Sequence, residues 1–424
     1  MLAIGVLLAC DPRSGAGASS SASAPSVEAP AMAGSASAEA AAPALDGAAL
    51  VRRFECARCH DDSSTPAAVQ ASAAVPSVTV AKHCYACHDS IVTNQFKAPE
   101  GARLSPAILA KWKSRVENLR FAPSLSGVGT LVREDWARDF LLAPHDVRPH
   151  LHGMMPRLAI TKQEATAIVR HLASSTSGAL PAEEPPQGSA ERGAKLFEEK
   201  ACGGCHALGG GSVRTTPPPG ETGDAAHVLA PDLRFARKRL VPGRLVAYLL
   251  DPRSVKSGAA MPKIPMSREE AHDLATFVLE VPLAAPTEEP KRARLPVLER
   301  PVGYDEVSER VFNRICWHCH SQPDYARGDG GPGNSGGFGF SARGLDLSSY
   351  ESIASGIVGR DGERTSVFSD AGGTPLLLAA LLARHEEVRG AEPGRVRGMP
   401  LGLPPLSSED IQLVETWISQ GHPR

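Results

Sequence analysis

The stretch Cys202-Gly203-Gly204-Cys205-His206 decides how this chain of 424 residues is interpreted, because its spacing recurs. Two cysteines three positions apart, with a histidine directly after them, also occur at Cys56–His60, Cys84–His88 and Cys316–His320. These four motifs contain eight of the nine cysteines, and the ninth is Cys10. A residue this rare does not fall into one pattern four times by chance. We therefore expect all four motifs to perform the same chemistry.

Cys-x-x-Cys-His is the attachment signature of c-type haem. Two thiols on one helical turn point the same way and can form thioethers with the two vinyl groups of one porphyrin, while the following imidazole binds the iron. The sequence thus predicts up to four covalently bound haem c groups. The predicted attachment residues are Cys56, Cys59, Cys84, Cys87, Cys202, Cys205, Cys316 and Cys319. The predicted iron ligands that follow them are His60, His88, His206 and His320.

Zinc sites and disulfides are the alternative interpretations of the cysteine pairs. A zinc ion could take the four thiols of the first two motifs, but this would leave the four adjacent histidines without a reason for their placement. Two further histidines lie within or next to the motifs. We interpret His318 and His83 as spacers or surface residues, although His83 is close enough to the first motifs to serve as an axial ligand.

Two stretches rich in Pro and small residues, 174–190 and 281–301, divide the chain into blocks at 47–173, 189–280 and 302–424. Each block opens with a helical pattern that runs into a motif and ends with Met-Pro followed by an amphipathic helix, and the first block holds two motifs. No alternating strand pattern is present. The predicted fold is mainly α, with three tandem helical domains and long loops.

Methionine usage suggests the ligand on the other side of each iron. Apart from Met1 and Met32, every methionine lies in one of the three Met-Pro segments. A core-filling methionine would be scattered over the helices instead. We therefore predict Met155, Met261 and Met399 as the sixth ligands, and a thioether in this position raises the reduction potential of haem iron.

With these features, the three blocks resemble class I c-type cytochrome domains, of a kind common in planctomycete and myxobacterial multihaem proteins. The resemblance implies that the carbonyl of a proline accepts the N–H of the proximal imidazole, in a segment of the form Ala-Pro-Asp-Leu. This chain has such segments at 230–233 and, as Ala-Pro-Ser-Leu, at 122–125. The third block lacks one.

Block 47–173 has two motifs but one Met-Pro. We pair His60 with Met155 and interpret Cys84–His88 as an inserted haem site, while the reverse pairing stays open. The inserted haem either has no sixth ligand or takes one from a set of nearby residues. That set is His83, His145, His150, His152 and Met154.

The N-terminus indicates export. Residues 1–9 are apolar but too short to span a bilayer, and Leu7-Leu8-Ala9-Cys10 resembles the lipobox of bacterial lipoproteins. We expect a signal peptide at 1–10 that ends at a lipidated Cys10, and a disordered Ala/Ser/Pro tether at 11–46. The expected location is the periplasmic face of the bacterial membrane, lipid-anchored, or the periplasm.

The charge balance, 45 Lys and Arg against 47 Asp and Glu, gives no reason to expect nucleic acid as a partner. We expect an electron-transfer protein without a substrate of its own, whose partners are other redox proteins of the cell envelope. The alternative is a multihaem oxidoreductase resembling cytochrome c peroxidases, which would use a haem with an open axial site. The inserted haem is the feature that supports this alternative.

Overall fold

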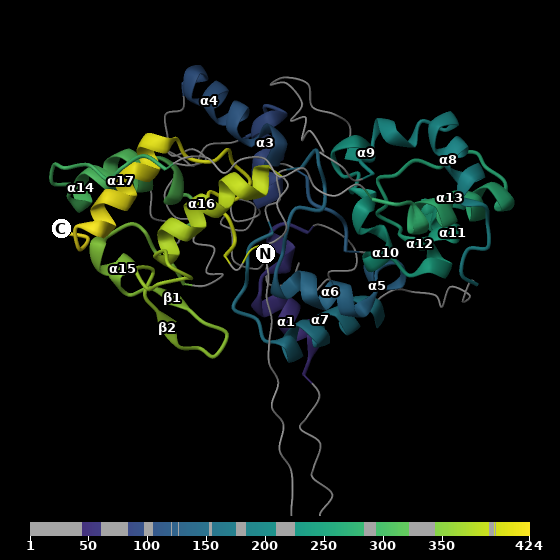
Figure 1. Ribbon diagram of the computed structural model, residues 1–424, viewed down its shortest axis with the longest axis horizontal. Coiled ribbons are helices and arrows are strands. Elements are labelled where there is room, and N and C mark those ends of the chain that lie inside the picture. The colour runs from purple at the N-terminus through teal and green to yellow at the C-terminus, as the bar shows by residue number, and fades with distance from the viewer. Residues whose placement is uncertain are drawn as a thin grey trace, which may run out of the picture. The chain divides into compact units, whose positions relative to one another are not determined.

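The computed structural model describes residues 45–60, 84–96, 105–119, 121–125, 127–151, 155–174, 184–208, 225–283, 294–321, 344–389, 394 and 396–424. These parts of the chain are mainly α-helical, as predicted (Figure 1). The predicted signal peptide, Cys10 and nearly all of the predicted tether lie outside them. No helix in the described ranges is long and apolar enough to cross a membrane.

A small hairpin, β1 (Ile357–Val358) paired antiparallel with β2 (Arg364–Thr365), departs from the all-helical expectation. Its strands have two residues each, and an alternating hydrophobic pattern needs at least four to be recognised. Across the turn between the two strands, the N–H of Gly359 donates to the carbonyl of Glu363 at 2.7 Å.

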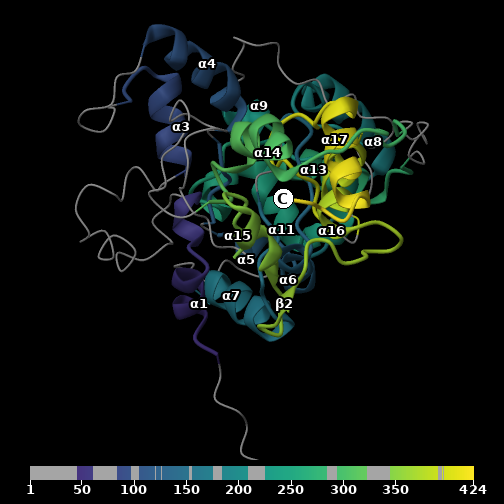
Figure 2. The same ribbon diagram turned by 90° about the vertical axis from the view of Figure 1, so that its left-hand side faces the viewer.

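The first block contains eight described helical elements. They are α1 (Gly47–Arg53), η1 (Cys56–Arg58), α3 (Cys84–Val92), α4 (Pro106–Val116), η3 (Glu117–Leu119), α5 (Val128–Leu131), α6 (Glu134–Leu142) and α7 (Lys162–Ser174). Figures 1 and 2 show α3 beside α4 and α1 beside α7. The last helix, α7, begins with the expected capping box, in which Thr161 and Glu164 each accept a backbone N–H of the other.

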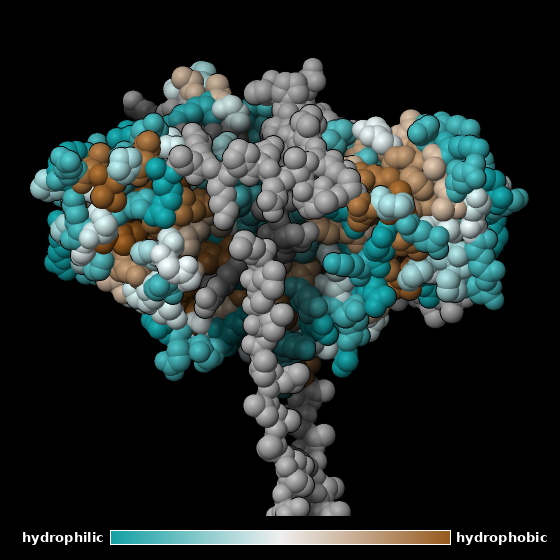
Figure 3. Space-filling view, in the orientation of Figure 1, coloured by the Kyte–Doolittle hydropathy of each residue, from teal (hydrophilic) through white to brown (hydrophobic). Residues whose placement is uncertain are grey.

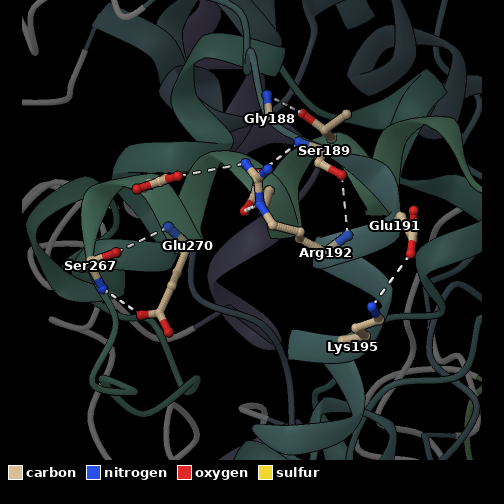
Figure 4. Close-up of polar contacts among 10 residues, drawn as sticks. Gly188, Ser189, Glu191, Arg192, Lys195, Ser267 and Glu270 are labelled. Atoms are coloured by element: carbon tan, nitrogen blue, oxygen red, sulfur yellow. Dashed lines mark hydrogen bonds and ion pairs between the residues drawn. The ribbon is translucent and has the colours of Figure 1, made fainter.

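The second block repeats this order. Its elements are α8 (Ala190–Glu199), η4 (Cys202–Gly204), α9 (Ala225–Val228), η5 (Leu233–Phe235), α10 (Ala236–Arg239), α11 (Pro242–Leu250), α12 (Pro252–Val255) and α13 (Arg268–Glu280). Arg192 of α8 donates to the nearly buried carboxylate of Asp273 on α13 at 2.7 and 2.9 Å, and Ser189 and Glu270 take part in the caps of the two helices (Figure 4). The first and last helices of the block are thereby fastened together.

Glycine sets how closely the first and last helices of these two blocks approach. Gly47 and Gly193 lie at the same distance before the first cysteine of their motifs. A Cβ at Gly47 would overlap the carbonyl of Ala167 on α7, and one at Gly193 would overlap that of Asp273 on α13. Backbone meets backbone at both crossings, so the helix that precedes a motif is fixed against the helix that follows a Met-Pro segment.

The third block has a different approach to its motif. Its elements are α14 (Tyr304–Val307), η6 (Ser308–Cys316), α15 (Tyr350–Ala354), the hairpin, α16 (Leu376–Val388) and α17 (Ser408–Ser419). The segment η6 is a π-helix that runs directly into Cys316. Its core is built around Phe312 and Trp417, which are 1% and 0% exposed.

Contacts between the blocks are extensive within residues 44–424, which form one compact unit. Leu131 of α5 belongs to the apolar cluster of α10 to α13. A buried ion-pair network joins the segment after α6 to α16, since Asp146 lies 2.7 Å from Arg397 and 3.6 Å from Arg384. The three blocks therefore describe a repeated order of local structure, and their boundaries as domains stay a prediction.

Candidate haem-binding sites

Three of the four motifs adopt the same turn. The carbonyl of the first cysteine accepts the N–H of the second cysteine at 3.2 Å and that of the histidine at 2.9–3.0 Å, at Cys56, Cys202 and Cys316 alike. In the first two of these turns the preceding residue has a left-handed backbone, with φ of 52° at Glu55 and 53° at Ala201. Such a φ is uncommon outside glycine and breaks the incoming helix, so that the two thiols and the imidazole follow as one compact unit.

The motif Cys84–His88 departs from this pattern because it forms the first turns of α3. His88 is only 4% exposed, although the helix that carries it has nine residues. The apolar cluster beside it is formed by Ile91, Val92, Trp112, Val116 and Leu119. The motif thus differs locally from the other three, and its interpretation as an inserted site stays a prediction.

All four motif histidines make the same hydrogen bond, from ring Nδ1 to a backbone carbonyl. The distances are 2.8 Å for His60 to Pro123, 2.9 Å for His88 to Leu119, 2.9 Å for His206 to Pro231 and 3.3 Å for His320 to Leu345. A carbonyl only accepts, so Nδ1 must carry the proton in each ring. The remaining nitrogen, Nε2, then has a lone pair for a metal, and the ring is fixed in orientation.

The bonds to Pro123 and Pro231 were expected from the Ala-Pro segments, whereas those to Leu119 and Leu345 were missed. For Leu345 the sequence does hold a signal. His206 and Pro231 are 25 residues apart, and so are His320 and Leu345. The following residues also match, because Asp232 and Asp346 each accept the backbone N–H two positions on. The third block therefore has the carbonyl that it was expected to lack.

Burial keeps the candidate ligands uncharged. It lowers the pKa of His88, His206 and His320, against a smaller rise caused by their carbonyl bonds. It also raises the pKa of the thiols, to about 11 at Cys56 and about 12 at Cys316. Neutral imidazoles are the form that binds iron. The buried thiols of Cys56 and Cys316 therefore stay protonated, and the neutral imidazoles offer Nε2 to a metal.

The cysteines form no disulfide where the structure describes their side chains, which is the case for Cys56, Cys59, Cys202, Cys205, Cys316 and Cys319. Nor do the described residues gather three or more His, Cys, Asp or Glu side chains in a metal-binding arrangement. The side chains of Cys84 and Cys87 lie outside this description.

Two of the three predicted methionines share an apolar cluster with a motif. Met155 packs on the cluster that also contacts Cys56, and Met399 on the one that contacts Cys316. The first of these placements favours the pairing of Met155 with His60. Met261 is half-buried and contacts no such cluster, whereas Met266 packs against that of the second block. Met154, His83 and His152 lie outside the described residues.

Haem carries two propionates, and buried cations near the motifs fit them. Arg239 is 8% exposed, and its buried Nε has no hydrogen-bond partner among the described residues. Its charge contributes to the low pKa of His206, so it lies close to that ring. Burial lowers the pKa of Arg239 and of Arg148 to about 10. A buried guanidinium with an unfilled donor is costly, which indicates that an anion belongs beside it.

A second unfilled donor lies near His88. Trp112 is 2% exposed, and its Nε1 has no hydrogen-bond partner among the described residues. It packs in the cluster of Leu119, whose carbonyl holds His88.

Apolar residues also reach the visible surface in two regions, over α16 and α17 and over α8 to α13 (Figure 3). The residues present therefore fit a large apolar ring that carries acidic groups.

Comparisons with known proteins agree with this chemistry for part of the chain. Residues 190–282 match the family model of cytochrome c. A segment of 129 residues, 28% of this chain, is 31% identical to cytochrome c oxidase subunit 2 of Alkalihalophilus pseudofirmus, of which it covers 32%. No solved structure matches the chain. Residues 190–282 are thus a cytochrome c domain, which implies covalently bound haem c and supports an electron-transfer role.

Proposed function

We propose that this protein transfers electrons between redox proteins and carries up to four haem c groups. The observation that supports it best is the repeated brace, in which all four motif imidazoles donate Nδ1–H to a backbone carbonyl. A brace of this kind orients a ligating histidine, and here it recurs at all four Cys-x-x-Cys-His motifs. The cytochrome c domain at 190–282 contains one of the four.

In this proposal each chain segment has a separate task. The two cysteines of each motif would bond the porphyrin, Nε2 of the histidine would bind iron, and Met155, Met261 and Met399 would each be a further iron ligand. The bound haems supply one-electron chemistry. The apolar clusters around the motifs would exclude water, and Arg239, whose charge acts on His206, would neutralise an acidic group of the haem. No side chain needs to move a proton.

The proposed location is the periplasmic side of a bacterial membrane. It is supported by the lipobox-like sequence that ends at Cys10 and by the thioether chemistry, which is completed outside the cytoplasm. A lipid on Cys10 and a tether at 11–46 would hold the protein near membrane-bound redox partners. The partners would be other redox proteins of the cell envelope.

An oxidoreductase remains the second candidate, because Cys84–His88 has no Met-Pro segment of its own. An iron with five ligands would be open to peroxide. Such an iron also binds carbon monoxide when reduced, whereas a haem iron that has two protein ligands besides the porphyrin does not. Carbon monoxide binding therefore separates the two functions.

The test is an optical redox titration of the full chain, produced with export and haem attachment. We expect four electrons per chain and no carbon monoxide bound by the reduced protein. The double variant Cys202→Ser/Cys205→Ser is the matched control and should take up one electron fewer. A wild-type chain without haem absorbance would contradict the proposal, and peroxide turnover together with carbon monoxide binding would favour the oxidoreductase.

A further inference from the structure

The candidate sites leave one ligand position without a residue, opposite His88. Of the residues expected there, the structure describes His145 and His150. His145 lies among aromatic rings, with Phe140 and Phe235 at centroid distances of 5.4 and 5.3 Å. His150 stacks on His227 at 4.0 Å. Each of these rings is thus packed against other aromatic rings.

A different histidine lies opposite His88. The ring centroid of His318 is 6.3 Å from that of His88, and the two planes are inclined by 27°. A metal lies about 2.0 Å from the imidazole nitrogen that binds it, so two imidazoles on opposite sides of one iron have centroids about 6.2–6.4 Å apart. The observed separation equals this span. The bond from a ring nitrogen to a metal lies in the plane of that ring, and each ring can rotate about its own bond. Two imidazole ligands of one metal can therefore have planes inclined by 27°.

The two rings are held in place by separate parts of the chain. Nδ1 of His88 is engaged by the carbonyl of Leu119, which leaves Nε2 for a metal. The residues on both sides of His318 are held by hydrogen bonds. Trp317 is 3% exposed and donates its Nε1–H to the carbonyl of Leu347 at 2.8 Å. The carbonyl of Cys316 accepts the N–H of Cys319. Hydrogen bonds therefore fix the ring of His88 and the backbone on both sides of His318.

Packing independently brings these segments together. The apolar cluster beside His88, formed by α3, α4 and η3, is also contacted by Leu403 from the third block. Leu403 follows Met399 closely, and its carbonyl accepts the Nε–H of the buried Arg384 at 2.8 Å. The third block thus lies against the inserted site through a contact other than the histidine pair.

From this geometry we propose that His318 is the sixth ligand of the haem attached at Cys84 and Cys87, opposite His88. The proposal rests on the proposed function, because it requires a haem at that motif. One turn of chain, Cys316–His320, would then attach its own haem and ligate the neighbouring one. Two imidazoles give a lower reduction potential than His and Met, so this haem would have the lowest potential of the four.

Ligation by His318 would also remove the open iron site on which the oxidoreductase function depends. With His318 bound, the haem iron at Cys84–His88 would have two protein ligands besides the porphyrin and no open site. His318 was interpreted from the sequence as a spacer, because it lies between two cysteines of another motif. Its neighbour in space, His88, is 230 residues away in the chain, and no local pattern signals such a contact.

The experiment uses the full chain with its haems, as wild type, His318→Ala and His150→Ala. Mass spectrometry counts the haems, and carbon monoxide is titrated into the reduced proteins. We expect four haems in all three, one equivalent of carbon monoxide for H318A and none for the wild type or H150A. Adding Cys84→Ser and Cys87→Ser to H318A should abolish that equivalent. The ferric wild type should show a bis-imidazole low-spin resonance, which H318A loses.

Two results would overturn the assignment. One is an H318A protein that keeps all its haems and binds no carbon monoxide. The other is a wild type that lacks the bis-imidazole resonance, and this measurement does not depend on how well the variant folds. Failure of the proposed function is separate, because it would show as missing haem mass on the wild-type peptide that contains Cys84 and Cys87.

Discussion

Replacing Gly193 with alanine tests whether the crossing of α8 and α13 holds the second motif in position. The added methyl would overlap the backbone of Asp273, which cannot turn aside as a side chain could. Overpacking costs about 1–3 kcal/mol, and a contact with backbone falls at the upper end. Alanine favours the helix by about 1 kcal/mol over glycine. The net expectation is a loss of about 2 kcal/mol.

The assay is urea unfolding of the full haem-bound chain, followed by the absorbance of the haems that have a methionine ligand. With a slope of about 2 kcal/mol per molar urea, the midpoint of this transition should fall by about 1 M. Lys195→Ala, on the exposed side of the same helix, is the control and should change stability by less than about 0.5 kcal/mol. Equal midpoints for G193A and K195A would refute the close crossing and the positioning role derived from it.

Three further predictions follow from the same structure. Gly47→Ala should lower the urea midpoint of unfolding around the haem at Cys56 by a similar amount, since α1 and α7 cross as closely as α8 and α13. An unchanged midpoint would show that the two crossings are not equivalent. Met399→Ala should let the reduced protein bind one carbon monoxide, whereas Met266→Ala should bind none. The pKa of Asp273 is lowered mainly by the hydrogen bond from Arg192. The carboxylate therefore contributes to the stability of the fold above the usual Asp pKa of 3.8, and this contribution is lost as the pH falls through the lower pKa of the folded state. Asp273→Asn should therefore flatten the loss of stability below pH 4, and an unchanged pH profile of the urea midpoint would contradict this.

Local patterns predicted the helices and their caps well. Ser267 and Glu270 form the expected capping box, and α8 ends at Glu199, just before the motif that it was expected to precede. These features depend on residues only a few positions apart, so the sequence holds the complete signal. The short hairpin was missed because strands of two residues have no detectable alternation.

Contacts between distant segments could be predicted only where a side chain marked them. The carbonyls of Pro123 and Pro231 were expected because proline stands out in a recurring segment. Leu119 and Leu345 serve in the same way through their backbone, which any residue provides, so their identity carries no signal. The pairing of His88 with His318 depends on how two blocks pack, and that packing is decided by many apolar contacts at once.

The buried ion-pair network illustrates the same limit. Asp146 and Arg397 look like ordinary surface charges in the sequence, yet both side chains are less than 5% exposed. Burying either one alone would be unfavourable, and only the assembled fold shows that they meet. Their contact links the chain before Met155 to the chain before Met399, so two predicted ligand segments are fixed relative to one another.

Peptide mapping by mass spectrometry of the exported wild-type protein tests the central claim most directly. Proteolytic peptides that contain Cys56–His60, Cys84–His88, Cys202–His206 and Cys316–His320 should each carry the mass of one haem, bonded through both cysteines. Peptides with free, bridged or zinc-bound thiols in these motifs, from a protein without Soret absorbance, would contradict the account.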